Sequence, residues 1–231
     1  MKKLLSIAMV ALLVCALALP ALADDWDDRV IKVSGNATVT LAADTATIQL
    51  GVNTKKPTVA QAQQENNQLM NAVLQALYGM GLTEKDVITS SFNVYSYTDY
   101  TADSQGMLYY EVDNMLSVTI RDLSQIGAVL DAAMSAGANT TYGISFSSTQ
   151  ENEAYQKALT RAVEDAAQKA QVLAAAAGKT LGELVTIDAT NSGFAYGVSN
   201  VYSEKAMDAG SVIVSGDVSV TANVTLEYTF K

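Results

Sequence analysis

The chain is organised around residues 137–179, which read GANTTYGISFSSTQENEAYQKALTRAVEDAAQKAQVLAAAAGK. Alanine recurs there at every fourth position, at Ala154, Ala158, Ala162, Ala166, Ala170 and Ala174. This period predicts one long helix over residues 151–177 with a small apolar face. Ser148 with Glu151 three residues later predicts a capping box at its start, and Gly178 predicts its end.

A row of alanine methyl groups lets another backbone approach closely. We therefore expect the alanine face either to pack on neighbouring elements of the same chain or to meet another subunit.

The first residues have the form of a secretory signal. Lys2 and Lys3 precede the apolar run Leu4–Leu19, and small residues stand at Ala21 and Ala23 before an acidic segment. We predict a signal peptide over 1–23 and a single domain over 24–231. The apolar run has about 16 residues, short for a membrane span of about 20, so no integral span is expected after cleavage.

Cys15 is the only cysteine, and the sequence contains no histidine. Residues 24–231 can therefore form no disulfide, no Cys or His metal site, no cysteine nucleophile and no triad with a histidine base. Loss of Lys2 and Lys3 changes the formal charge from −10 to −12, which disfavours nucleic acid as a partner.

Alternation of apolar residues, together with turn and cap residues, predicts the other elements. We expect a hairpin over 30–41 and 45–53, a helix capped by Thr58 over 58–79, a second hairpin over 87–100 and 107–121, a helix opened by Asp122, strands at 142–146 and 184–189, a long loop over 190–211, and a closing strand pair or one bent strand over 212–230.

This order predicts an α+β fold: a mostly antiparallel sheet with a split βαβ-like core and three main helices, including the long alanine-rich helix over 151–177. Val33-Ser34-Gly35 near the start is echoed by Val214-Ser215-Gly216 near the end, so both ends of the chain are expected in one sheet.

The chain resembles the SIMPL domain family of bacterial envelope and secreted proteins from Val33 to Phe230. The matching positions are Val33-Ser34-Gly35, Asp44-Thr45-Ala46, Gly51-Val52, Ala62, Asn66, Met70, Gly81-Leu82, Asp86, Thr89-Ser90, Tyr97, Val118, Asp122-Leu123, Gly137-Ala138-Asn139, Gly143-Ile144-Ser145-Phe146, Ala158, Ala162, Lys169-Ala170, Leu173-Ala174, Gly178 and Leu181-Gly182. The resemblance implies export to the periplasm, cell envelope or medium, an α+β domain and self-association, and it supplies no catalytic, cofactor-binding or metal-binding residue.

Aromatic residues gather at the tip of the second hairpin and in the long loop. Because tyrosine is enriched at interfaces, we predict a contact surface for a second copy or an envelope protein. Its candidate residues are Tyr95, Tyr97, Tyr100, Tyr109, Tyr110, Phe194, Tyr196 and Tyr202. The alternative is that the hairpin tyrosines cover an edge of their own domain.

Other functions remain open at this point. One is a hydrolase that uses a carboxylate pair or a serine with a lysine base, and another is a protein that binds a small ligand or cation. Asp44, Asp86 and Asp122 each stand where a turn or helix cap is expected, which explains them without catalysis. The favoured interpretation is a non-enzymatic exported protein that requires no cofactor.

Overall fold

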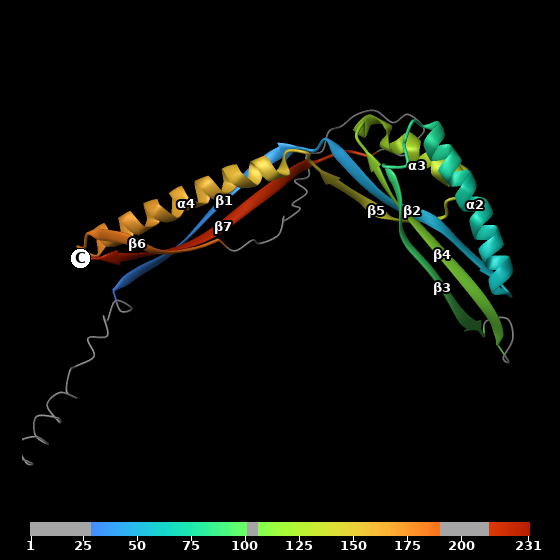
Figure 1. Cartoon of the computed structure of the whole chain (residues 1–231), viewed down its shortest axis with the longest axis horizontal. Helices are drawn as coiled ribbons and strands as arrows, with labels where there is room; N and C mark the ends of the chain where they lie inside the picture. Colours follow the sequence, from blue (N-terminus) through green and yellow to red (C-terminus); the bar gives the residue numbers. More distant parts are fainter. Residues whose placement is uncertain (1–28, 101–105, 190–212) are drawn as a thin grey trace, which may run out of the picture. The chain divides into compact units, whose positions relative to one another are not determined.

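The computed structural model describes residues 29–100, 106–189 and 213–231 (Figure 1). Its elements are β1 (Val30–Ala42), β2 (Thr45–Lys56), α2 (Val59–Gly79), β3 (Val87–Asp99), β4 (Met107–Ile120), the 3-10 turn η2 (Leu123–Gln125), α3 (Ile126–Ser135), β5 (Thr140–Ser147), α4 (Glu151–Ala176), β6 (Leu181–Asp188) and β7 (Asp217–Phe230). The predicted signal peptide over 1–23 and the loop over 190–211 lie outside the described residues.

Four strands form an antiparallel sheet with the order β3-β4-β2-β5. The chain segment that builds it runs β2-α2-β3-β4-α3-β5, and α2 and α3 lie on one face of this sheet (Figure 1). This is the split βαβ arrangement, so the predicted α+β fold with that core is confirmed. The hairpin formed by β3 and β4 is confirmed as well.

The other strands form a separate sheet with the order β1-β7-β6. Side-chain contacts join Lys32 to Glu227, Ser34 to Thr225 and Thr38 to Thr221. Residue numbers rise along β1 as they fall along β7, so these strands are antiparallel. The two ends of the chain thus share a sheet, as the echo predicts, although Val214-Ser215-Gly216 precedes β7 and only Val33-Ser34-Gly35 lies within a strand.

The predicted hairpin between β1 and β2 is wrong, because these strands belong to different sheets. Of the two residues between them, Asp44 donates its N–H to the backbone oxygen of Ser147 and accepts from the N–H and hydroxyl of Thr149. These contacts tie the turn to the segment just before α4. An alternating pattern identifies the buried face of a strand and says nothing about which strand it pairs with.

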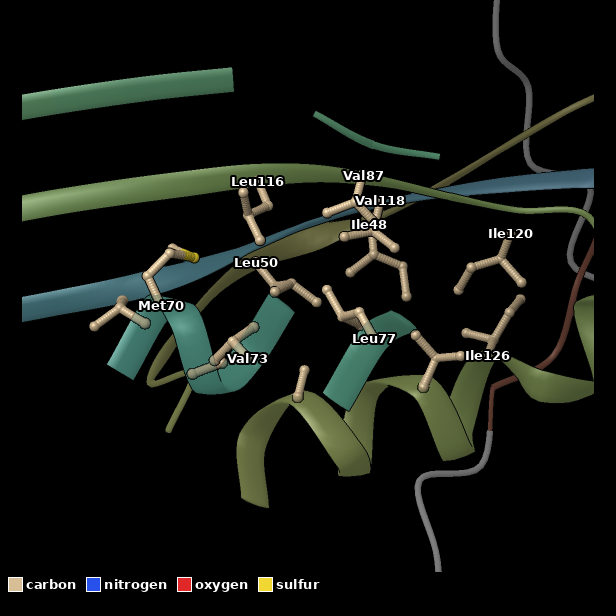
Figure 2. Close-up of a cluster of buried hydrophobic side chains, with 14 of the residues drawn as sticks. Ile48, Leu50, Met70, Val73, Leu77, Val87, Leu116, Val118, Ile120 and Ile126 are labelled. Atoms are coloured by element: carbon tan, nitrogen blue, oxygen red, sulfur yellow. The ribbon is translucent and has the colours of Figure 1, made fainter. Parts of the chain in front are cut away.

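The core of the four-stranded sheet follows from the alternation in β2. Its side chains at Ile48, Leu50 and Val52 are fully buried. Figure 2 shows Leu50 and Ile48 facing side chains of α2, including Val73 and Leu77. Asn66 interrupts this apolar face of α2, and its Nδ2 donates to the carbonyl oxygens of Val52 and Val112, at 2.8 and 3.1 Å. One amide thus ties α2 to two adjacent strands.

The alanine face of α4 is buried along its whole length. All six alanines of the row are at most 1% exposed. Ala154 packs with Val218 and Val220 of β7. The capping box is confirmed, because the N–H of Ser148 donates to Glu151 Oε1 at 2.9 Å, and Gly178 ends the helix with φ of +68°. The alanine face of α4 is therefore covered by the three-stranded sheet.

By its contacts the chain divides into two compact units. One contains residues 36–162 and 213–223 and includes the four-stranded sheet. The other contains residues 29–35, 163–189 and 224–231 and includes β6 with parts of β1, α4 and β7. In each unit, its portion of α4 lies along its portions of β1 and β7 (Figure 1).

Candidate functional site

Three of the predicted tyrosines lie on one face of the β3–β4 hairpin. Tyr97 pairs across the strands with Tyr109, and Tyr95 pairs with Glu111. Directly opposed residues of antiparallel strands point to the same face, and Lys55 of β2, also opposite Glu111, joins them there. Phe194, Tyr196 and Tyr202 lie outside the described residues.

Lys55 is the centre of this cluster. Its Nζ lies 4.2 Å from the ring centroid of Tyr97 and 4.5 Å from that of Tyr109, within the range of cation–π attraction. The two rings are stacked with centroids 6.1 Å apart, and Nζ also pairs with Asp99 Oδ2 at 3.2 Å. The Lys55 ammonium therefore holds both rings by cation–π attraction, and its charge is balanced by the Asp99 carboxylate.

A polar network adjoins these rings. Asn53 Nδ2 donates to Glu111 Oε1 at 2.6 Å. Desolvation of the Tyr95 hydroxyl, followed by its hydrogen bond to Glu111, raises the pKa of Tyr95 above its ordinary value. Tyr95 therefore stays a neutral hydroxyl at physiological pH, which suits a hydrogen-bond donor in a contact surface better than a base or nucleophile.

The remaining two hairpin tyrosines lie elsewhere. Tyr110 is opposite Lys56, which pairs with Glu65 of α2, so Tyr110 points to the helix-covered face. Tyr100 follows the end of β3 and is 66% exposed. The structure thus gathers Tyr95, Tyr97 and Tyr109 on one face of the hairpin, with Tyr110 on the other face and Tyr100 beyond the end of β3.

Several apolar residues near these tyrosines are exposed, which the sequence did not predict. Met107 and Leu108 at the start of β4, and Phe92 and Val94 in β3, are each about half exposed. Alternation predicts that Phe92 and Val94 face the core, since Val94 is opposite the buried Val112. They are exposed because β3 is the edge strand, and no local pattern distinguishes an edge strand from a central one.

The carboxylates that could support hydrolysis are occupied with structural contacts. Asp86 accepts from the N–H and hydroxyl of Thr83 and from Arg121. The Thr83 hydrogen bonds, chiefly from its hydroxyl, and then Arg121 lower the pKa of Asp86 to about 2. Hydrogen bonds from Thr149 lower the pKa of Asp44, and those from Ser124 lower the pKa of Asp122. A general acid needs a raised pKa, so these three groups are poor candidates for that role.

Within residues 29–100, 106–189 and 213–231, no group of three or more acidic, histidine or cysteine side chains could hold a metal ion. Over the same ranges, no helix combines the length and apolarity that crossing a membrane requires.

Comparison with protein families gives one match that covers most of the chain. The model described as SIMPL, protein of unknown function (DUF541), matches residues 31–228.

Curated relatives agree with this match. The 26 kDa periplasmic immunogenic protein of Brucella melitensis biotype 1 is 30% identical over 185 residues, which cover 76% of this chain and 74% of that protein. The protein of the same name from Brucella abortus (strain S19) is similar to the same extent. The uncharacterized protein YggE of Escherichia coli (strain K12) is 26% identical over 68% of this chain and 64% of its own length.

Proposed function

Since this chain belongs to the SIMPL family of proteins of unknown function, we propose that it is a non-enzymatic exported protein that assembles with itself or binds an envelope protein through the end of its β3–β4 hairpin. We call this the hairpin surface and define it as the residues around the end of the hairpin: Tyr95, Tyr97, Met107 and Tyr109 on one face of the strands, Leu108 on the other face, and Tyr100 just beyond β3. Export, predicted from the N-terminal sequence, agrees with the two Brucella relatives, which are named as periplasmic proteins.

One observation carries the proposal: aromatic and apolar side chains are exposed together at the hairpin surface. Tyr95 is 47% exposed, Tyr100 is 66% exposed, and Met107 and Leu108 are each about half exposed. Exposed apolar groups gathered around one end of a hairpin are typical of interaction sites in soluble proteins. The rings of Tyr97 and Tyr109 are held by Lys55, so binding a partner requires little further ordering of these side chains.

A charge substitution at the hairpin surface tests self-association. We expect the double variant Tyr100→Lys/Leu108→Lys to reduce the molar mass measured by light scattering at high micromolar concentration, because two ammonium groups would have to be desolvated in the contact. The matched control is Tyr142→Lys/Ile88→Lys, which replaces a tyrosine and an aliphatic residue that are 72% and 59% exposed on other parts of the sheet.

Two results would count against self-association through this surface. A wild-type protein with the mass of one chain at that concentration contradicts self-association, and an equal loss of mass in the control contradicts the choice of surface. Binding of an envelope protein is tested separately by a photocrosslinking residue introduced at Tyr100, with the same residue at Tyr142 as control. No crosslink specific to position 100 in intact cells would contradict partner binding.

A further inference from the structure

Strand β3 presents a free edge to which a further strand can be added. We infer that this edge binds an extended segment of another protein in which lysine or arginine alternates with aliphatic residues. The inference rests on the proposed binding of an envelope protein and names the chemistry of the segment that is bound. All the residues of this site lie in one compact unit, within residues 36–162.

The outer side of β3 has no neighbour among the described strands, because the sheet order is β3-β4-β2-β5 (Figure 1). From Ser91 to Asp99 the strand pairs with β4 without a further irregularity, so these residues present a regular edge. The sequence of β3, VITSSFNVYSYTD, contains no lysine or proline, the residues that commonly keep strand edges from pairing. The outward backbone groups of this edge are therefore suited to hydrogen bonds with an added strand.

An added strand would meet different chemistry on the two faces of β3. On the helix-covered face of the sheet, Phe92 and Val94 are 47% and 44% exposed. On the opposite face lie the carboxylates of Glu111 and Asp113, on the adjacent strand β4. Since successive residues of a strand point to opposite faces, a segment that complements both faces alternates aliphatic with basic residues.

The negative charge on the open face is not balanced by ion pairs. Among the described residues, no lysine or arginine forms an ion pair with Glu111 or Asp113. Desolvation and then the hydrogen bond and charge of Glu111, with the charge of Asp113, raise the pKa of Tyr95, so both carboxylates lie near its hydroxyl. Basic side chains of a partner would balance these two charges beside β3.

A lysine on the added strand can reach these carboxylates, as Lys55 shows within the same sheet. Lys55 stands on β2, yet its Nζ extends past β4 to pair with Asp99 of β3, at 3.2 Å. A lysine on a strand beside β3 likewise has one strand to cross before it reaches β4. Opposite Tyr95, its ammonium would pass the Tyr95 ring on the way to Glu111, where cation–π attraction adds to the ion pair.

The edge of β6 in the other sheet suits such a segment less well. β6 has 8 residues, and its pairing with β7 is irregular at two places. The Lys32 ammonium pairs with Glu227 and lies near Asp188, so a cation of the same sheet already balances carboxylates there. β3 therefore has both the longer regular edge and the unbalanced negative charge.

The edge strands of a second copy do not provide the required chemistry. Among the described strands, β1, β3, β5 and β6 are the edges, and their sequences together contain one basic residue, Lys32. That residue is already paired with Glu227. The segment bound at β3 therefore belongs to a different protein.

Synthetic peptides as long as the regular edge over residues 91–99 test the inference. The probe alternates lysine with valine. One control alternates glutamate with valine, and a second has the composition of the probe with all lysines before all valines, so that its charges cannot share one face of a strand. We expect the probe alone to bind in isothermal titration calorimetry and to slow hydrogen exchange at the outward N–H groups of residues 91–99.

Two pairs of variants locate the site. Val94→Lys places a lysine on the β3 edge, and its control Ile187→Lys places one on the β6 edge; both side chains are exposed, so both proteins should fold, which circular dichroism checks. We expect Val94→Lys to lose probe binding and Ile187→Lys to keep it. Asp113→Asn should weaken binding about two- to fivefold, the effect of one exposed ion pair, while Glu183→Gln on β6 should not change it.

The inference is overturned if the probe does not bind, if either control peptide binds as tightly, or if the β6 variants lose binding to the same extent as the β3 variants. Slower exchange of residues 91–99 at high protein concentration without peptide would make a second copy the occupant and overturn it as well. A crosslink specific to position 100 in cells, without probe binding at β3, leaves the proposed function standing and overturns this inference. Probe binding at β3 without that crosslink supports the inference and contradicts the hairpin surface as the contact.

Discussion

At the scale of single residues, buried polar groups connect the helices to the strands. Asn66 is fully buried, and its amide donates to the backbone oxygens of Val52 and Val112. An apolar residue in its place would leave both oxygens without this donor. A buried acceptor that loses its partner costs about 1–3 kcal/mol, so the hydrogen bonds explain why a polar residue occupies this apolar face.

Substitutions at Asn66 should show both the donor requirement and a pH dependence. We expect Asn66→Leu to lower the free energy of unfolding by about 1–3 kcal/mol. Asn66→Asp should be more damaging at pH 7, because an ionised carboxylate would face two carbonyl oxygens. Burial raises the pKa of that introduced carboxyl, so the stability of this variant relative to wild type should fall as pH rises above about 4. Urea unfolding at pH 4 and pH 7 measures this, and an Asn66→Asp protein as stable as wild type at pH 7 would contradict it.

Asp86 gives a pH dependence of the opposite sign. Its pKa is lowered from 3.8 to about 2 by Thr83 and Arg121, so its ionised form stabilises the folded chain. That stabilisation is present above pH 3.8 and is lost as pH falls through about 2. We expect Asp86→Asn to melt at a lower temperature than wild type at pH 7, and the difference to shrink between pH 4 and pH 2. A difference in melting temperature that stays constant over this range would show that Asp86 does not act through its charge.

At the scale of elements, α4 depends on close contact through small side chains. Because the side chains of its buried alanine row are small, the backbone of α4 lies close to the strands. Larger residues at these positions would prevent this close approach. The exposed side of the same helix carries charged pairs such as Lys169 with Asp165. The helix is therefore specified by the size of its buried residues more than by their hydrophobicity.

Enlarging one alanine should separate α4 from its sheet. We expect Ala166→Leu to lower the free energy of unfolding by about 1–3 kcal/mol, because added methylenes in a packed contact force neighbouring groups apart. Ala175→Leu is the matched control, since Ala175 is exposed on the same helix. Chemical denaturation of both variants measures the effect. Equal stability of the two would mean that the alanine row is not tightly packed in solution.

At the scale of the whole molecule, exposed strand edges suggest how an acidic chain could assemble. Both sheets end in edge strands with exposed aliphatic residues, at Val94 of β3 and at Val185 and Ile187 of β6. With a formal charge of −10, two copies repel each other unless their contact pairs opposite charges.

Helices and caps could be predicted from the sequence because they depend on neighbouring residues. The alanine period, the Thr58 cap and the Ser148–Glu151 capping box involve contacts within a few residues, and the structure has each of them. The same holds for the β3–β4 hairpin, whose strands are close in sequence. The exposure and precise setting of the tyrosine cluster could not be foreseen, because Lys55 reaches it from a different strand.

The sequence by itself determined which residues form helices and strands and which faces of them are apolar, since periodicity is a local property of the chain. Only the tertiary structure decided that β1 pairs with β7 and not with β2, and that β6 and β3 are edge strands. It also decided that a second sheet covers the alanine face of α4. Strand partners lie far apart in sequence and are chosen by the packing of whole surfaces. For that reason, the surfaces proposed here for assembly became visible only after the strands had been placed in their sheets.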